Sequence, residues 1–340
     1  LGMIESFLEV SEKEKELLLS RERPIVILRE KKRCVSALVA PSMEYHGIML
    51  PYMPFQFQLF DAAPDMVLVM TSGNVSEEPI VFRDDEAILK LGPFVDYVIS
   101  YNRAIASHTD DSVLFVEGGA PYFIRRSRGY VPVPFMREHG ALQTLALGGD
   151  MKNCFALSRG GTVIMSQHLG DISTPSGNRL FRRTVDMFRK IYDFNPEAVA
   201  ADLHPGYFTT SIADEFQASG LRRVDVQHHH AHIASVMDEK GLRDSVIGLA
   251  FDGTGFGTDG TLWGSEFLVA DRRSFERAAH FSYFQLPGGE SAIHDVWKIA
   301  VSMLYRRFGD SIPLFADEPG APVLIEMMRK GINSPETCSI

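Results

Sequence analysis

Apolar runs of strand length alternate with segments of helical periodicity along most of the chain. In the first third, the runs at 23–30 and 112–118 are bounded by charged or turn-forming residues, which is typical of strands. Shorter apolar runs at 66–70 and 95–100 predict two further strands. Residues 1–20 mix apolar and charged positions, which predicts an amphipathic helix.

The second half opens on three apolar runs within 143–172, separated by a glycine-rich turn and a Gly-Gly turn. Apolar positions spaced by three and four predict a helix at 178–194, and a strand at 198–203 precedes another helix. The strand–turn–strand pattern returns at 245–273, with a turn rich in Gly, Asp and Thr. The repeated shape predicts an internal duplication with two lobes facing a cleft. The fold class is therefore α/β, and we expect the second lobe to be truncated.

The stretch 123–135 predicts the exit from a first domain. Its arginines and prolines indicate extended backbone, and a polar linker follows at 136–143. The predicted domains are therefore 1–137 and 138–340, within the two or three expected for a chain of 340 residues.

The composition is that of an ordinary acidic globular protein. The chain is 45% hydrophobic and 23% charged, with a formal net charge of −10 and a pI of about 5.6. That balance argues against broad binding to nucleic acid, which needs a dense set of Lys and Arg facing phosphates. No apolar run approaches the ~20 residues that cross a bilayer, so we expect no membrane partner. Cys34, Cys154 and Cys338 are too far apart for a thiolate zinc site and suit a reducing compartment, which predicts a cytoplasmic protein.

The histidine cluster at 228–232 is the clearest candidate for a metal site. His228 and His232 are four residues apart, so both imidazoles leave the same face if 226–240 is helical. A carboxylate would complete a facial set suited to Zn or Fe, and Asp252, at the end of an apolar strand, is the best candidate. The alternative is a helix start whose histidines only bond to neighbours, with Asp252 capping its own turn.

Two glycine-rich turns, at 148–153 and 252–260, are candidates for phosphate binding. Glycine lets backbone N–H groups approach phosphate oxygens closely, and a lysine in the first turn adds a positive charge. Neither turn is a Walker A motif or a strand–helix GxGxxG fingerprint, so each alone also fits an ordinary hairpin. As a facing pair they predict a nucleotide site formed by Gly148, Gly149, Asp150, Lys152, Asn153, Gly253, Thr254 and Gly255.

Polar residues of the first half cluster in places that also fit a nucleotide. Ser72 and Asn74 follow an apolar run, where they either bond to a ligand or form the turn. Arg125, Arg126 and Arg128 either clamp phosphates or belong to a solvated exit strand. The adjacent aspartates of HTDDSV hold Mg²⁺, orient an arginine or simply form a turn.

Many of these motifs, in this order, resemble the HypF carbamoyltransferase family of [NiFe]-hydrogenase maturation. In the first half, RPIVIL, GIMLPYMP, MTSGNVSEEPI, DDSV and IRRSRGYVP resemble its YrdC-like domain. In the second half, LALGGDMKN, SQHLGDI, ADLHPGY, HHHAH, AFDGTGFG with WGSEF, and LPGGESAIHDVWKIA resemble its C-terminal domain. The resemblance implies a YrdC-like domain with a mixed twisted sheet, also described as double-stranded RNA binding-like. An actin-like, duplicated RNase-H-like ATPase domain, similar to the tRNA threonylcarbamoyl transferase, would follow it.

The resemblance also implies a chemistry. In the family, the YrdC-like domain joins carbamate, derived from carbamoyl phosphate, to ATP, and the carbamoyl group then passes to the C-terminal Cys of the partner HypE. The implied cofactors are ATP with Mg and a divalent metal, Zn or Fe, held by His228, His232 and Asp252. Ser72, Asn74 and the arginines of IRRSRG would contact nucleotide in the YrdC-like domain. The two glycine-rich turns would line the nucleotide cleft of the second domain.

The chain departs from the family pattern at three positions. Ala104 and His108 stand where the family has Pro and Arg, and Ser265 stands where a second Gly is usual. The change at His108 puts one phosphate contact in doubt. The resemblance implies that the acylphosphatase and zinc-finger regions, the start of the YrdC-like domain and a distal acidic metal ligand would lie outside this sequence. We therefore expect the chain alone not to run the full reaction.

Two alternatives remain open. A fused tRNA threonylcarbamoyladenosine biosynthesis protein would resemble both halves. However, its second lobe typically carries Ser-Gly-Gly-His-Thr where this chain has DGTGFGTDG, and a net charge of −10 does not favour a tRNA surface. The other alternative is a non-catalytic module that binds a nucleotide and a metal and docks a partner.

Overall fold

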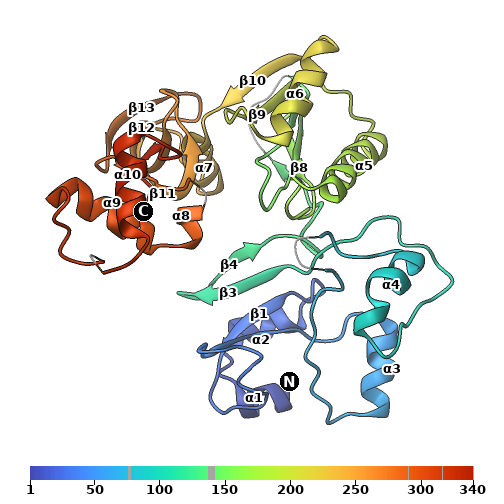
Figure 1. Ribbon diagram of the computed structural model, residues 1–340. Coiled ribbons are helices and arrows are strands. Elements are labelled where there is room, and N and C mark those ends of the chain that lie inside the picture. The colour runs from blue at the N-terminus through green and yellow to red at the C-terminus, as the bar shows by residue number, and fades with distance from the viewer. Residues whose placement is uncertain (76–77, 137–141, 290, 316, 340) are drawn as a thin grey trace. The chain divides into compact units, whose positions relative to one another are not determined.

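The structure, a computed structural model, describes residues 1–75, 78–136, 142–289, 291–315 and 317–339. The chain forms two compact units (Figure 1). Unit 1 comprises Leu1–Ala200 with Ser211–Arg223, and unit 2 comprises Ala201–Thr210 with Val224–Ile340. The predicted boundary between residues 137 and 138 lies outside the described residues and stays a prediction. Among the described residues, the structure contains no helix that is both long and apolar enough to cross a membrane.

The first sheet of unit 1 has four strands in the order β2-β1-β3-β4. They are β1 (Ile25–Arg29), β2 (Tyr45–Ile48), β3 (Val113–Glu117) and β4 (Ala120–Arg125). β1 is antiparallel to β2 and parallel to β3, so the sheet is mixed. Alternate residues of β1, Val26 and Leu28, are fully buried in one core with Leu18. The strands predicted at 23–30 and 112–118 are therefore confirmed.

Other predictions for the first third are wrong or incomplete. The runs at 66–70 and 95–100 form no strand, and most of their side chains are exposed, because local apolar character does not supply a pairing partner. The predicted helix at 1–20 is two helices, α1 (Gly2–Phe7) and α2 (Glu12–Leu19). Ser11 starts α2 through a capping box with Glu14, which separates it from α1. The remaining helices of this part are α3 (Pro54–Ala62), α4 (Asp84–Lys90) and η1 (Gly92–Phe94).

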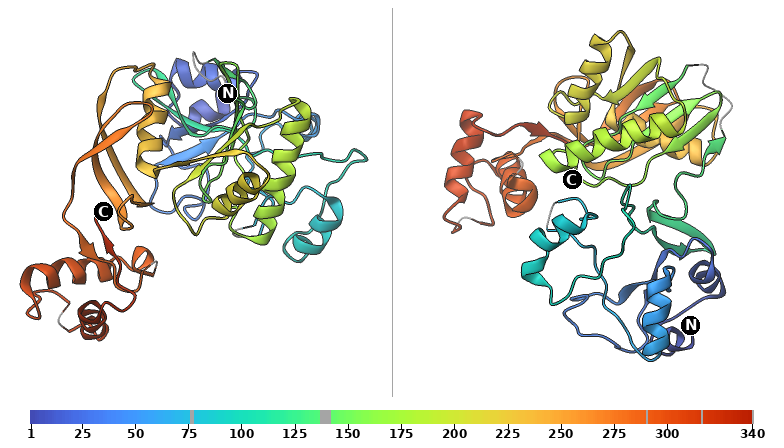
Figure 2. Two further views of the ribbon diagram at one scale, coloured as in Figure 1. Left: turned by 90° about the horizontal axis from the view of Figure 1, so that it is seen from above. Right: turned by 90° about the vertical axis from the view of Figure 1, so that its right-hand side faces the viewer.

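The second sheet has six strands in the order β10-β9-β6-β7-β8-β5. They are β5 (Phe135–Met136), β6 (Thr144–Ala146), β7 (Ala156–Arg159), β8 (Thr162–Met165), β9 (Ala198–Asp202) and β10 (Arg222–Val226). β6, β7 and β8 form an antiparallel meander, and β9 is parallel to β6. α5 (Pro175–Ile191) lies beside this sheet (Figure 2), with Phe181 and Phe188 edge-on against Phe155. Together with α6 (Phe208–Ala218), these elements confirm the predicted order β-β-β-α-β-α.

Unit 2 is built on a second antiparallel meander, formed by β11 (Val246–Phe256), β12 (Leu262–Ala270) and β13 (Phe275–His280). The strands β6–β8 form the same kind of antiparallel meander. The internal duplication inferred from this repeated pattern stays a prediction. α7 (His228–Glu239) packs on the unit 2 meander through Ile233 and Met237. β14 (Phe284–Gln285), β15 (Glu336–Thr337) and α8 (Ser291–His294) follow. α9 (Trp297–Phe308) and α10 (Ala321–Lys330) pack together around Val301 and Leu324 (Figures 1 and 2).

The glycine-rich stretch 252–260 is a strand for half of its length, which corrects the prediction of a turn. β11 continues to Phe256 with a register shift before Gly255, and the turn follows it. A Cβ on Gly255 would lie 2.5 Å from Cε1 of His229 and 2.9 Å from Cβ of His228. Glycine is therefore needed here because β11 runs directly against α7.

Candidate functional site

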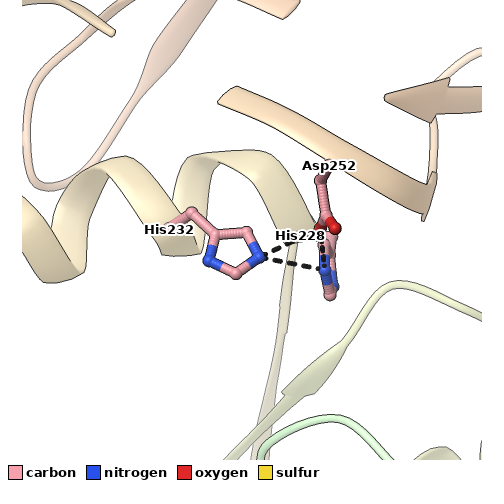
Figure 3. Close-up of side chains that lie close together, drawn as sticks. All are labelled: His228, His232 and Asp252. Carbon is pink, nitrogen blue, oxygen red and sulfur yellow. Dashed lines mark hydrogen bonds and ion pairs between the residues drawn. The ribbon is translucent and has the colours of Figure 1, made fainter. Parts of the chain in front are cut away.

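His228 and His232 lie on the first two turns of α7 and face Asp252 on β11 (Figure 3). Their Nε2 atoms are 3.2 Å apart, and Oδ2 of Asp252 lies 2.9 Å from that of His228 and 3.1 Å from that of His232. Three ligands at ~2.1 Å from one ion have ligand atoms roughly 3.0–3.4 Å apart. The residues therefore fit a metal, and two imidazoles with a carboxylate suit Zn²⁺ or Fe²⁺. The side chain of His232 is 58% exposed, which leaves one side of the group open.

Asp202, the last residue of β9, orients the ring of His228. Its Oδ2 lies 2.7 Å from Nδ1 of His228, so the ring presents Nε2 to Asp252. The other oxygen of Asp202 accepts the backbone N–H of His204 at 2.8 Å, which fixes the carboxylate itself. A carboxylate behind the histidine is usual at metal sites, where it sets the tautomer and the ring orientation.

The two carboxylates set the charge of the histidine between them. Hydrogen bonds to Asp202 and then to Asp252 raise the pKa of His228 to about 9 in the metal-free chain. Bonds from His228 and His232 hold the pKa of Asp252 far below its usual range. At neutral pH the metal-free group therefore carries a proton on His228, which a metal must displace when it binds.

The other two histidines of the cluster have structural contacts. His229 is fully buried, and burial lowers its pKa to about 4, so its ring is neutral. Gln227 caps α7, since its side-chain oxygen accepts the N–H of His230 at 2.9 Å, and its amide nitrogen lies 3.1 Å from Nδ1 of His229. Nε2 of His230 lies 2.8 Å from the carbonyl oxygen of Asp271. The cluster thus divides into two histidines that face Asp252 and two that hold α7 in place.

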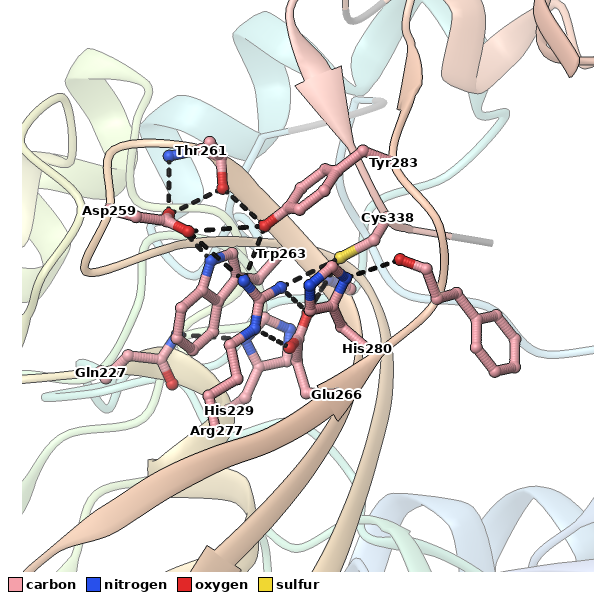
Figure 4. Close-up of polar contacts among 12 residues, drawn as sticks. Gln227, His229, Asp259, Thr261, Trp263, Glu266, Arg277, His280, Tyr283 and Cys338 are labelled. Carbon is pink, nitrogen blue, oxygen red and sulfur yellow. Dashed lines mark hydrogen bonds and ion pairs between the residues drawn. The ribbon is translucent and has the colours of Figure 1, made fainter. Parts of the chain in front are cut away.

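Arg277 joins the turn after β11 to the strands of unit 2 (Figure 4). Its guanidinium donates to the fully buried Glu266 at 2.6 Å and to Asp259 in the turn at 3.3 Å. It also lies over the ring of Trp263, 3.9 Å from the centroid, while the indole N–H donates to Asp259 at 2.9 Å. The buried carboxylate of Glu266 is thereby paired, and the turn is held in one conformation. The adjacent Ser265 is fully buried, and its hydroxyl has no partner within the described residues.

The residues predicted to bind phosphates in the glycine-rich turns belong to different units. Gly148, Gly149, Asp150, Lys152 and Asn153 lie between β6 and β7 in unit 1, whereas Gly253, Thr254 and Gly255 lie on β11 in unit 2. The buried Asn153 shapes the first loop by donating to the carbonyls of Leu147 at 2.9 Å and Gly149 at 2.6 Å. Lys152 is exposed. A role of this loop in nucleotide binding stays a prediction.

A cavity of about 690 Å³ lies in unit 1, with Ile25 of β1 in its wall. Its lining brings together Ser72, Asn74 and Arg125, three of the residues predicted to contact nucleotide. Pockets of roughly 300–1,000 Å³ are usual for small ligands. The side-chain amide of Asn74 donates to the carbonyl of Glu78 at 3.1 Å, so this residue also shapes the wall.

Two aspartates hold Arg125 in the lining of this cavity. Nε of Arg125 donates to the carbonyl of Asp111 at 2.9 Å, and Nη1 donates to Oδ2 of Asp110 at 3.4 Å. Of the roles considered for the adjacent aspartates, the structure therefore shows that they orient an arginine. A guanidinium fixed in this way presents its remaining N–H groups in one direction.

The other two predicted arginines do not line the cavity. Arg128 donates to Oδ1 of Asp111 at 2.6 Å, and its guanidinium lies 3.5 Å from the ring centroid of Tyr52, which does line it. Arg126 lies over the ring of Phe135, 4.4 Å from the centroid. Arg128 therefore supports the wall of the cavity, whereas the contacts of Arg126 lie outside its lining.

His108, which departs from the family pattern, lies in the cavity wall. Its ring stacks on Phe82 with centroids 5.6 Å apart, and burial lowers its pKa. It is 7% exposed, and its Nδ1 has no partner in the part of the chain that the structure describes. The wall is completed by His168 and the three residues after it.

The sequence reasoning missed Asp202 and His168. Each stands in a quoted motif, ADLHPGY or SQHLGDI, but neither has a spacing that predicts its contact. Asp202 meets a histidine 26 positions away, and His168 meets an aspartate 58 positions away. Only the folded chain brings these groups together.

Three family models match the chain in succession. One described as Telomere recombination, for the Sua5, YciO and YrdC proteins, matches residues 1–127. The HypF Kae1-like domain matches residues 139–239, and the second subdomain of the carbamoyltransferase Kae1-like domain matches residues 248–340. The chain therefore has the domain order of a carbamoyltransferase, a YrdC-like domain followed by a Kae1-like domain.

Relatives and solved structures identify the family. The chain is 38% identical to carbamoyltransferase HypF2 of Cupriavidus necator over 98% of its own length, and 37% identical to HypF of Synechocystis sp. over 91%. The crystal structure of full-length HypF in the phosphate- and nucleotide-bound form matches with a TM-score of 0.92 at 37% identity, covering 100% of this chain and 54% of that one. T. kodakarensis HypF matches with a TM-score of 0.91 at 36% identity, covering 99% and 46%. The chain belongs to the HypF carbamoyltransferase family. It spans 44% and 40% of the length of the two curated relatives.

Proposed function

We propose that the chain carries out the adenylation and transfer steps of a HypF-type carbamoyltransferase. In the unit 1 cavity, an oxygen of carbamate attacks the α-phosphorus of ATP, the bond to the β-phosphate oxygen breaks, and pyrophosphate leaves. The thiolate of the C-terminal Cys of HypE then attacks the carbamoyl carbon, and AMP leaves with the bridging oxygen. The substrates are ATP with Mg²⁺ and carbamate derived from carbamoyl phosphate. The product is carbamoylated HypE for cyanide-ligand synthesis, and the compartment is the cytoplasm.

The observation that carries this proposal is the convergence of Ser72, Asn74 and Arg125 on one cavity of about 690 Å³. These residues come from two motifs separated by about fifty positions. A guanidinium held by Asp110 and Asp111 provides a fixed positive charge for leaving phosphate groups. The walls of this cavity would limit the access of water to the carbamoyl-adenylate anhydride.

In unit 2, His228, His232 and Asp252 would hold a divalent metal, Zn or Fe, and Asp202 would keep His228 in the ligating orientation. When bound there, the metal would supply Lewis-acid polarisation of a phosphate or carbamoyl oxygen. The exposed side of His232 leaves room for an acceptor to approach. A role of either glycine-rich stretch in nucleotide binding stays a separate prediction for each unit.

Isotope exchange of pyrophosphate into ATP tests the adenylation step. The chain is given ATP, Mg²⁺ and ammonium carbamate, and we expect exchange that depends on carbamate. Arg125→Ala should lower the exchange rate about tenfold or more, since the fixed cation is lost. His294→Ala, at an exposed histidine of α8, is the matched control and should exchange like the parent.

The double variant His228→Ala/His232→Ala separates the two steps. It should keep the exchange reaction but lose carbamoylation of a peptide ending in the HypE cysteine, because only the transfer step uses unit 2. Exchange that requires threonine and bicarbonate would instead identify a threonylcarbamoylation protein. ATP binding without exchange under either condition would leave a non-catalytic nucleotide-binding and metal-binding module.

A further inference from the structure

The Kae1-like part of the chain contributes to the wall of the unit 1 cavity. His168, Leu169, Gly170 and Asp171 line it, and all four lie in the region matched by the HypF Kae1-like domain. Every other lining residue lies in the region matched by the YrdC-like model. The cavity is therefore composite, and its properties depend on residues that the YrdC-like region alone does not contain.

His168 contacts the carboxylate that orients Arg125. Its Nδ1 lies 2.9 Å from Oδ2 of Asp110, and the same oxygen accepts from Arg125 at 3.4 Å. Burial on its own raises the pKa of Asp110, but the bond to His168 and the charge of Arg125 outweigh it, so the pKa is lowered. An ionised carboxylate only accepts hydrogen bonds, so Nδ1 of His168 must donate. One carboxylate is therefore shared by an imidazole and a guanidinium.

The residue before His168 anchors the loop that carries Asp110. Gln167 is 4% exposed, and its amide donates to the hydroxyl of Ser107 at 3.0 Å and to the carbonyl of His108 at 3.4 Å. These bonds join residues about sixty positions apart in the sequence. The two residues Gln167 and His168 thus hold the backbone and the carboxylate of the same loop.

The other side of this segment is bonded to the first glycine-rich loop. Leu169 donates its N–H to the carbonyl of Asn153 at 2.9 Å, and Gly170 accepts the N–H of Asn153 at 2.8 Å. Ile172 donates to the carbonyl of Asp150 at 3.0 Å. A segment bonded on both sides holds its side chains in place before a ligand arrives.

We propose that His168 is a positioning residue for the adenylation step, acting through Asp110 on Arg125. The inference rests on the proposed function of the cavity as an ATP site. Nη2 of Arg125 has no protein partner in the described ranges, so it is the group left to contact a phosphate. Without His168, the carboxylate of Asp110 keeps only Arg125 as a side-chain partner and can rotate. The guanidinium of Arg125 is then no longer held in one orientation toward the cavity.

Binding of Mg-ATP, measured by calorimetry, tests this inference together with the KM and kcat of pyrophosphate exchange. We expect His168→Ala to raise the Kd and the KM for ATP about tenfold, with a melting temperature close to that of the parent. His168→Asn carries a side-chain N–H near the position of Nδ1 and should recover binding to within about threefold of the parent. His294→Ala is again the control histidine.

A double-mutant cycle asks whether His168 acts through Asp110. If it does, His168→Ala/Asp110→Asn should bind ATP no more weakly than Asp110→Asn alone. Independent, additive losses would overturn the proposed route, as would equal losses in His168→Ala and His168→Asn. Unchanged ATP binding in His168→Ala, with a parent that binds, would overturn the inference alone. A parent chain that does not bind ATP would overturn the proposed function of the cavity, and the inference with it.

Discussion

His228 is the most constrained of the candidate metal ligands, because carboxylates lie against both of its ring nitrogens. Asp202 is 2.7 Å from Nδ1, and Asp252 is 2.9 Å from Nε2. His232 has only its Nε2 engaged by this group, and its side chain is more than half exposed. The two histidines are therefore unequal, one fixed in advance and one freer to adjust to an ion or a substrate.

His228, His232 and Asp252 should determine the metal content of the chain. The chain is expected to bind about one Zn²⁺ or Fe²⁺, and His228→Ala/His232→Ala should abolish it, because a single carboxylate cannot hold the ion. Elemental analysis of purified protein measures this directly, with His294→Ala as the control. An unchanged metal content in the double variant would refute the assignment of the ligands.

Asp202→Asn tests the carboxylate behind His228. The variant keeps the shape of the side chain but loses the charge that supports the imidazole, and such changes typically weaken metal affinity about 10–100-fold. Competition with a chelator measures the affinity. Asp214→Asn, at an exposed aspartate of α6, provides a control in which the metal affinity should match the parent. Parent-like affinity in Asp202→Asn would show that the orientation of His228 does not depend on this charge.

His108 predicts a sensitivity to acid. Burial lowers its pKa below the value of 6.5 for a free histidine, so the unfolded chain takes up this proton more readily than the folded one. Neutral His108 therefore contributes its full stabilisation at pH values above 6.5, and this stabilisation is lost as the pH falls below 6.5. Between about pH 7.5 and pH 5.5, the melting temperature of the parent should fall further than that of His108→Gln. If the melting temperatures of both proteins fell equally, a group other than His108 would cause the acid sensitivity.

At the scale of elements, the close approach of β11 to α7 determines the geometry of the candidate metal site. Gly248 faces Ile233, where a Cβ would lie 2.3 Å from Cδ1, and Gly255 faces His229 at 2.5 Å. With side chains at these two positions, the strand would move away from the helix, and Asp252 would move with it. The glycines in this stretch thus serve packing as well as any phosphate contact.

Gly255→Ala and Gly253→Ala form a matched pair for this packing. The first places a methyl group against the buried ring of His229 and should destabilise the chain by about 1–3 kcal/mol and weaken metal binding. The second has no heavy atom within 4 Å of the added Cβ, so its stability should remain close to that of the parent. Denaturant unfolding measures both. If both variants lost the same free energy of unfolding, the contact between Gly255 and α7 would not be the reason that glycine is needed there.

At the scale of the whole molecule, each compact unit contains its own candidate site. The cavity with Arg125 lies within unit 1, and the group of His228, His232 and Asp252 lies within unit 2. A ligand that binds only the folded form stabilises the part of the chain that contacts it. The two ligands are therefore expected to protect different segments.

Hydrogen exchange with mass spectrometry tests that expectation. Mg-ATP should slow exchange in the cavity walls, at 70–74, 78–80, 108–111 and 168–171, whereas Zn²⁺ should slow exchange in α7 and β11. Protection of unit 2 alone by ATP would contradict the assignment of the nucleotide to the unit 1 cavity. The double variant His228→Ala/His232→Ala should keep the ATP pattern and lose the Zn²⁺ pattern.

The regular elements with strong periodicity were predictable from sequence, and so were the members of the histidine group. Helical spacing places His228 and His232 on one face, and a strand end beside glycines makes Asp252 the best partner. The exposed apolar runs at 66–70 and 95–100 were predicted wrongly as strands, because strand formation needs a pairing edge that local composition does not reveal. The length of β11 was missed because its glycines indicate a turn unless α7 is known to lie against them.

The sequence alone predicts the α/β class, the motif order that resembles HypF, and the three candidate metal ligands. Only the folded structure shows which arginine reaches the cavity. Arg125 ends β4 and pairs with Asp110, whereas Arg128 lies beyond that strand and pairs with Asp111. The folded structure also brings Asp202 to His228 and His168 to Asp110. Residues that are neighbours along the chain are related by helical or strand periodicity, which a sequence displays. Contacts between distant segments depend on how sheets and loops pack, and no local pattern encodes that packing.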